Sequence, residues 1–146
     1  MRMTEVAFHF NAPDKISYAC RLLRKATRQG ARVVVTGSAE LLQQLDSALW
    51  TFSATDFVAH SLAVDDAAAL AASPVLLLES VLHAPHQQVL LQLGDAVPQG
   101  FERFERLIEV VSLDEDDRAL ARQRWKHYAS RGYAVQRKDL KLKEST

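Results

Sequence analysis

The chain has 146 residues, 48% of them hydrophobic and 25% charged, which is typical of one soluble globular domain, and its eighteen basic residues balance eighteen acidic ones. A single cysteine, Cys20, excludes an internal disulfide, and the longest strongly apolar run, Ala67 to Leu78, is shorter than the roughly 20 residues of a membrane span. The N-terminus carries Glu5 and His9 where a secretory signal would be apolar, so we expect a soluble, cytoplasmic protein with no membrane partner.

The first fifty residues alternate between predicted strands and helices. Val6 to Phe10 is a strand ended by a turn, and Ile16 to Gln29 has the three- and four-residue apolar spacing of a helix that stops at Gly30. Arg32 to Thr36 is a second strand, and a second helix begins at Ser38 and runs to about Trp50. This order predicts a parallel α/β sheet with crossover helices.

The middle of the chain consists of short segments. Four apolar runs have the length of strands, namely Asp56 to His60, Val75 to Glu79, Gln88 to Leu93 and Leu107 to Ser112. Two further segments have helical character, the alanine-rich Asp65 to Ala72 and the short Phe101 to Arg106.

The C-terminal part is predicted to hold one long helix. Ser112 to Glu115 has the form of a capping box that opens a helix from about Asp114 to Arg131, which ends at Gly132. Residues 136–146 are polar and basic and are predicted to be a tail that follows a single domain of residues 1–135. The whole pattern predicts a three-layer α/β/α domain on a mostly parallel sheet of about five strands.

The glycine-rich loops that cradle phosphates in nucleotide-binding α/β proteins are missing. The turn after the first predicted strand, Asn11 to Asp14, has no glycine, and the turn after the second has only Gly37. The sequence therefore indicates no cofactor and no catalytic residues. An α/β enzyme or nucleotide-binding domain without recognisable motifs remains an alternative.

The metal ligands and nucleophiles of the chain are few and scattered. His83 and His86, with His60, form a weak pattern with no Cys, Asp or Glu at ligand spacing, so we expect no metal site. Cys20 falls on the apolar stripe of the first predicted helix, which favours a role in the core.

Charge is concentrated near the C-terminus, where nine Lys or Arg follow position 117 against two acids, Asp139 and Glu144. Within the long helix, helical spacing aligns a cationic and aromatic stripe of Arg118, Arg122, Trp125, Lys126 and Ala129. Such a stripe suits a partner that offers a carboxylate beside an aromatic or aliphatic group. A solvated amphipathic helix with its Trp packed inward, and direct binding of single-stranded DNA, are the alternatives.

Large aromatic residues cluster around the end of the second predicted helix. Trp50, Phe52 and Phe57 lie within eight positions of one another. They either close the sheet edge or form an exposed docking patch, and the pattern alone favours the core.

Four motifs together resemble one family. They are Asp46-Ser47-Ala48-Leu49-Trp50, Asp56-Phe57-Val58-Ala59-His60, the stretch from Leu120 to Tyr128 (LARQRWKHY), and Gly132-Tyr133. They resemble the chi subunit family of bacterial DNA polymerase III, and the likeness extends over most of the chain. The resemblance implies a small, non-catalytic α/β subunit of the clamp-loader assembly that binds the acidic, phenylalanine-terminated tail of the single-stranded DNA-binding protein.

The resemblance also assigns residues to the tail-binding site. Arg122 and Lys126 would hold the terminal carboxylate, and Arg118 would attract the aspartates of the tail. Val111 and Trp125 would contact the terminal Phe, although the family pattern has Tyr at position 125. Nucleic acid would then be contacted mainly indirectly.

A separate surface is implied for a second partner. The resemblance places Trp50 and Phe57 on the surface that binds the psi subunit or, alternatively, a helicase. We therefore expect an adaptor that links the coated single strand to the polymerase or to a helicase.

Overall fold

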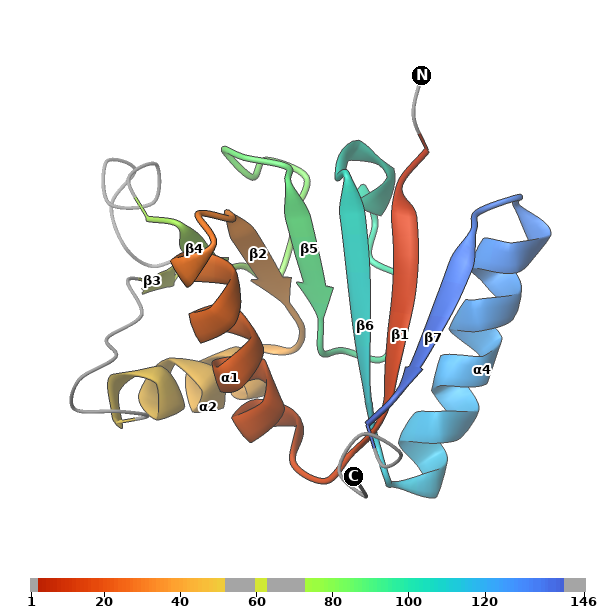
Figure 1. Cartoon of the computed structure of the whole chain (residues 1–146), viewed down its shortest axis with the longest axis horizontal. Coiled ribbons are helices and arrows are strands. Elements are labelled where there is room, and N and C mark those ends of the chain that lie inside the picture. The colour runs from red at the N-terminus through yellow and green to blue at the C-terminus, as the bar shows by residue number, and fades with distance from the viewer. Residues whose placement is uncertain (1–2, 52–59, 63–72, 141–146) are drawn as a thin grey trace.

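The computed structural model describes residues 3–51, 60–62 and 73–140. Within these residues, seven strands form one sheet in which every pair is parallel, in the order β3-β4-β2-β5-β6-β1-β7 (Figure 1). The strands are β1 (Glu5–Ala12), β2 (Val33–Thr36), β3 (His60–Leu62), β4 (Val75–Leu77), β5 (Val89–Gln92), β6 (Arg106–Ser112) and β7 (Val135–Asp139). The helices are α1 (Lys15–Arg28), α2 (Ala39–Thr51), the 3-10 helix η1 (Phe101–Arg103) and α4 (Glu115–Ser130).

The predicted α/β fold is confirmed, with more strands than expected. Its layers follow from side-chain alternation, because neighbouring residues of a strand point to opposite faces. Val33 and Val35 belong to the core cluster under α1 and α2, whereas Val34 between them belongs to the cluster under α4 and η1. Helices therefore cover both faces of the sheet, as buried parallel strands require.

The helix ends show why the helices begin where they do. Asp14 caps α1 and Asp114 caps α4, each side chain accepting hydrogen bonds from the second and third backbone N–H groups beyond it. The predicted capping box, with Ser112 as the cap, is therefore wrong, because Asp114 caps α4. The Ser112 hydroxyl instead donates to Oδ2 of Asp117 at 2.9 Å. Gly132, with φ +86°, follows α4 in the left-handed conformation that glycine adopts without strain.

Two predicted elements differ from the structure. The start of the predicted tail is wrong, because Val135–Asp139 forms the edge strand β7, which pairs with β1. The short helix predicted over Phe101 to Arg106 ends at Arg103, and β6 begins at Arg106. Of the strand predicted over Asp56 to His60, only His60 lies within the described residues, and it begins β3. The helical segment predicted over Asp65 to Ala72 lies outside the described residues. Within the described ranges, every helix is too short or too polar to cross a membrane.

Candidate functional site

A surface cavity of 310 Å³ lies between α4, the C-terminal end of β1 and the middle of β7. It draws residues from three elements, and these are Phe10, Asn11, Arg118, Arg122, Trp125 and Arg137. Three of the predicted tail-binding residues, Arg118, Arg122 and Trp125, therefore share one cavity. These three members of the stripe predicted from helical spacing form one wall of it, whereas Lys126 and Ala129 do not line it, and the strands supply the rest.

The apolar part of the cavity is aromatic. Trp125 is half-buried, and its ring centroid lies 5.1 Å from that of Phe8 and 6.1 Å from that of Phe10. Phe8 is fully buried in the core under α4, so this cluster anchors Trp125 to the sheet. Trp125 thus packs inward on one side, as the amphipathic-helix alternative predicts, and lines the cavity on the other.

The polar part of the cavity is cationic. Arg118 is 37% exposed, and its guanidinium lies 3.5 Å from a Glu115 oxygen, whereas Arg122 is exposed. On the opposite wall, Arg137 from β7 holds its guanidinium carbon 5.3 Å from the centre of the Phe10 ring, in cation–π contact. No carboxylate belongs to the described lining. Guanidinium groups beside an aromatic surface suit a carboxylate attached to an apolar group.

The other two predicted tail-binding residues lie elsewhere. Lys126 is exposed on α4 and does not line the cavity, and Val111 is fully buried in the core beneath α4. Their contacts with a tail stay predictions.

Three lining residues were not predicted from the sequence, namely Phe10, Asn11 and Arg137. Phe10 ends the predicted first strand. Its spacing of two residues from Phe8 is the one sequence signal that Phe8 and Phe10 lie on the same face of the sheet. Arg137 fell within the predicted tail, where no pairing with β1 was expected.

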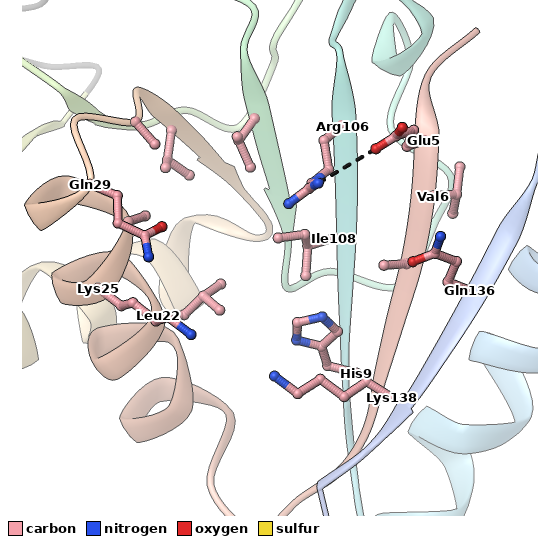
Figure 2. Close-up of a pocket in the computed structure, with 15 residues that line it drawn as sticks. Glu5, Val6, His9, Leu22, Lys25, Gln29, Arg106, Ile108, Gln136 and Lys138 are labelled. Carbon is pink, nitrogen blue, oxygen red and sulfur yellow. Dashed lines mark hydrogen bonds and ion pairs between the residues drawn. The ribbon is translucent and has the colours of Figure 1, made fainter.

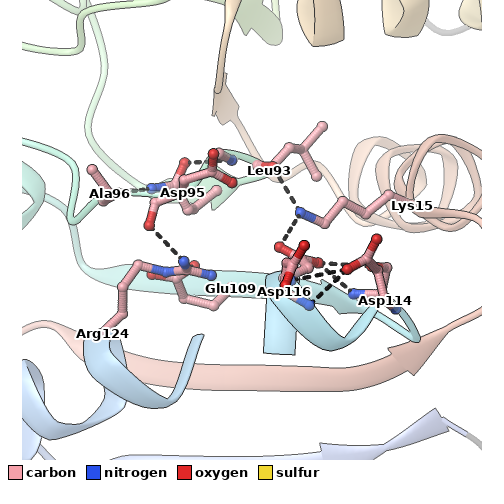
Figure 3. Close-up of polar contacts among 12 residues, drawn as sticks. Lys15, Leu93, Asp95, Ala96, Glu109, Asp114, Asp116 and Arg124 are labelled. Carbon is pink, nitrogen blue, oxygen red and sulfur yellow. Dashed lines mark hydrogen bonds and ion pairs between the residues drawn. The ribbon is translucent and has the colours of Figure 1, made fainter. Parts of the chain in front are cut away.

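A buried polar cluster fixes α4 on the sheet (Figure 3). Glu109 of β6 is fully buried and accepts hydrogen bonds from Nε of Arg124 at 3.1 Å and from the Tyr128 hydroxyl at 2.6 Å. Arg124 also donates to the backbone oxygen of Asp95 at 2.6 Å. Burial raises the pKa of Glu109 to about 7, even though the Arg124 charge acts in the opposite direction. Arg124 and Tyr128 flank Trp125 in the sequence, so this cluster sets the rotation of α4 about its axis.

A second polar contact ties the start of α4 to α1 (Figure 3). The Lys15 ammonium lies 3.1 Å from an Asp117 oxygen and donates to the Leu93 carbonyl at 2.9 Å. Burial opposes ionisation of Asp117, but hydrogen bonds from Ser112 and the Lys15 charge outweigh it and lower the pKa. Arg118 follows Asp117 directly, so this contact helps to place the cationic wall.

Trp50 occupies the opposite end of the sheet. It lies near the end of α2, is 60% exposed, and its ring centroid is 5.2 Å from that of His60. The pattern-based expectation of a core position for Trp50 is therefore wrong. His60 is in turn 3.0 Å from an Asp46 oxygen. Phe57 and Phe52 lie outside the described residues.

The remaining chemical candidates do not converge. His83 is exposed, while His86 is buried, and burial together with the nearby Arg32 charge lowers the pKa of His86. Across the part of the chain that the structure describes, no three His, Cys, Asp or Glu residues are grouped as metal ligands would be. Cys20 is buried in the core, as predicted, and burial raises the pKa of its thiol to about 11.

The fold and the cavity define a three-layer α/β/α domain with a cationic and aromatic surface site. Residues 3–136 match the family described as DNA polymerase III chi subunit, HolC. A DNA polymerase III subunit chi from Pseudomonas aeruginosa is 33% identical over 139 residues, which cover 92% of this chain and 95% of that protein. The chain belongs to the DNA polymerase III chi subunit family, and this membership supports an accessory role in the replisome.

Proposed function

We propose that the chain is a non-catalytic adaptor of the clamp-loader assembly and that its cationic cavity binds the acidic C-terminal tail of single-stranded DNA-binding protein. The observation that carries the proposal is the cavity that Arg118, Arg122 and Arg137 share with Phe10 and Trp125. A chain end that carries both a carboxylate and a phenyl ring is complementary to this lining, because the carboxylate can contact the arginines and the ring can contact Phe10 and Trp125.

The division of labour within the cavity follows from the positions of its groups. Arg122 is the exposed guanidinium on α4 and is placed to hold the terminal carboxylate in two parallel hydrogen bonds. Trp125 and Phe10 offer the apolar surface for the terminal ring. Arg118 and Arg137 extend the positive charge on either side, where the acidic residues before the chain end would lie.

A second surface would link the adaptor to the polymerase or to a helicase. An indole that is 60% exposed is a large apolar group to leave in water, and exposed Trp residues are common anchors of protein interfaces. We propose that Trp50, together with Phe57, docks the psi subunit or, alternatively, a helicase. The two surfaces lie on different elements, α2 and α4, so both partners can bind at once.

Titration of a labelled tail peptide into the full chain tests the proposed function. The peptide with a free C-terminal carboxylate should bind, and the same peptide with a C-terminal amide should bind at least about tenfold more weakly, because one charge-assisted contact is worth about 1.5–3 kcal/mol. Affinity should also fall as salt rises, since the contact is partly ionic.

A single-stranded oligonucleotide serves as the second ligand in the same assay. We expect no saturable binding of the oligonucleotide to the chain alone. Equal affinity for the acid and the amide, or binding of the oligonucleotide in place of the peptide, would reject the tail-binding assignment.

A further inference from the structure

Strand β1 contains one extra residue where it borders the cationic cavity. From His9 to Ala12 the strand takes three residue steps, while the paired segment of β6, Val110 to Ser112, takes two. This count is that of a β-bulge, which redirects side chains relative to the regular alternation of a strand. The bulge accommodates Asn11, whose φ of +66° lies in the left-handed region that Asn adopts more readily than most residues.

The bulge turns Asn11 toward α4. His9 lines a groove between α1 and the strands β6, β1 and β7 (Figure 2), and Ala12 packs in the core under α1, so both residues face that side of the sheet. In a strand without the extra residue, Asn11 would share this side with His9. Asn11 instead joins Phe10 in the lining of the cationic cavity. The bulge therefore adds a polar side chain to a site that otherwise offers arginines and aromatic rings.

Strand β7 fixes which end of the Asn11 amide a ligand can reach. Gln136 and Lys138 line the groove beside α1 (Figure 2), so alternation places Asp139 on the opposite face, together with Arg137. Nδ2 of Asn11 donates to Oδ1 of Asp139 at 2.9 Å, and because an ionised carboxylate only accepts, the amide nitrogen is the end that faces Asp139. Within the described part of the chain, the carbonyl oxygen of Asn11 has no hydrogen-bond partner. Asp139 thus orients an unused acceptor in the wall of the cavity.

We propose that this carbonyl oxygen of Asn11 accepts a hydrogen bond from the backbone N–H of the last residue of the bound tail. The inference rests on the tail-binding function proposed above and adds a specificity-determining residue to it. The carboxylate, the benzyl group and the N–H of that residue are all attached to one α carbon, so a tail end held by Arg122 and Trp125 brings its N–H into the same cavity. Among the six described lining residues, Asn11 is the one with a side-chain acceptor, because arginine and tryptophan only donate and phenylalanine does neither.

Three contacts around one α carbon also make the site selective for handedness. A tail peptide that ends in D-phenylalanine can satisfy only two of the three contacts at once. Its affinity for the wild-type chain should therefore fall by at least about fivefold, which is the effect of one lost hydrogen bond. Equal binding of the peptides that end in L- and D-phenylalanine would overturn the proposal.

Replacement of the last amide of the tail peptide by an ester tests the contact itself, because the ester keeps the carboxylate and the ring but has an oxygen in place of the N–H. The wild-type chain should bind the amide about fivefold more tightly than the ester. Asn11→Gly keeps the positive φ and removes the side chain, so it should bind both peptides within about twofold of each other. Gln136→Ala, which changes the groove beside α1, is the matched control and should keep the wild-type preference.

Fluorescence anisotropy of the two peptides, each labelled at its N-terminus, measures these affinities. A wild-type chain that binds the ester and the amide equally would overturn the role of Asn11, and so would an Asn11→Gly chain that still prefers the amide. Tail binding itself would stand in both cases, since the peptides are bound. Failure of every peptide to bind the wild-type chain would instead reject tail binding, and this inference with it.

Discussion

Arg122 and Lys126 lie one turn apart on α4, yet only Arg122 lines the cationic cavity. We expect Arg122→Ala to weaken binding of the tail peptide by at least about tenfold, because a charge-assisted contact is lost. Lys126→Ala should change the affinity by less than about threefold, since Lys126 lies outside the cavity and a solvent-exposed charge at that distance contributes little. Fluorescence anisotropy of the labelled peptide measures both variants, and a loss at Lys126 as large as that at Arg122 would contradict this assignment.

The same helix shows what spacing can and cannot predict for single residues. Arg118, Arg122 and Trp125 were found because steps of four and three keep residues on one helical face. Lys126 was included in the stripe, but one residue further turns the side chain by about 100° away from Trp125. Asn11 and Arg137 could not be found this way, since they meet α4 only through the pairing of β1 with β7.

Within the contact between α4 and β6, Glu109 gives the fold a pH dependence that can be measured. Its pKa is raised from the ordinary 4.5 to about 7 by burial, so the native chain binds this proton more tightly than the unfolded chain does. The contribution of Glu109 to the free energy of unfolding is fully present below its pKa in the unfolded chain, and it is lost as pH rises through its pKa in the folded chain. Relative to Glu109→Gln, the free energy of unfolding of the wild type should therefore decrease from about pH 5 to about pH 7.

Urea unfolding of both proteins across that range makes the measurement. The pKa of Asp117 is lowered, so Asp117 stays ionised throughout, and the remaining groups are common to both proteins and cancel in the difference. A difference that is constant with pH, or that increases, would contradict the assigned direction for Glu109.

Strand β7 places two neighbouring side chains on opposite faces of the sheet. Arg137→Ala should weaken binding of the tail peptide roughly five- to tenfold, because it removes a cation from the cavity beside Phe10. Gln136→Ala is the matched control, since Gln136 faces the groove beside α1 and should leave the affinity unchanged. Equal effects of the two substitutions in the peptide titration would show that β7 does not form a wall of the site.

Elements were predicted well where the sequence marks their ends. Asp14 and Gly30 mark the two ends of α1, and the acidic first turn and Gly132 mark the two ends of α4, because caps and turns have specific chemical requirements. Strand β7 was missed because its composition is polar and basic, as is common for an edge strand. Strand β7 joins the sheet by pairing with the backbone of β1, and this pairing cannot be deduced from the composition of β7.

At the scale of the whole molecule, the two proposed partner surfaces lie toward opposite ends of the sheet. Trp50→Ala should leave the tail affinity within about twofold, since distant sites act additively. It should weaken association with the polymerase assembly by at least about tenfold, as expected for an exposed Trp anchor. Copurification with the assembly and the peptide titration measure the two effects, and a parallel loss of both would show that the surfaces are not separate.

The overall α/β architecture was predictable because alternating strands and helices permit few topologies. The number of strands was not, since β3 and β7 are a short strand and a polar strand at the two edges of the sheet. The cationic cavity depends on that edge, so only its α4 wall could be identified from the sequence.

The two tryptophans of the chain provide the most direct test of tail binding. In a ¹H–¹⁵N correlation spectrum, the indole N–H signals of Trp50 and Trp125 report the two ends of the sheet separately. Addition of the tail peptide should shift the Trp125 indole signal in a saturable way and leave the Trp50 signal in place. A saturable shift at Trp50 with none at Trp125 would contradict the assignment of the cationic cavity as the tail-binding site.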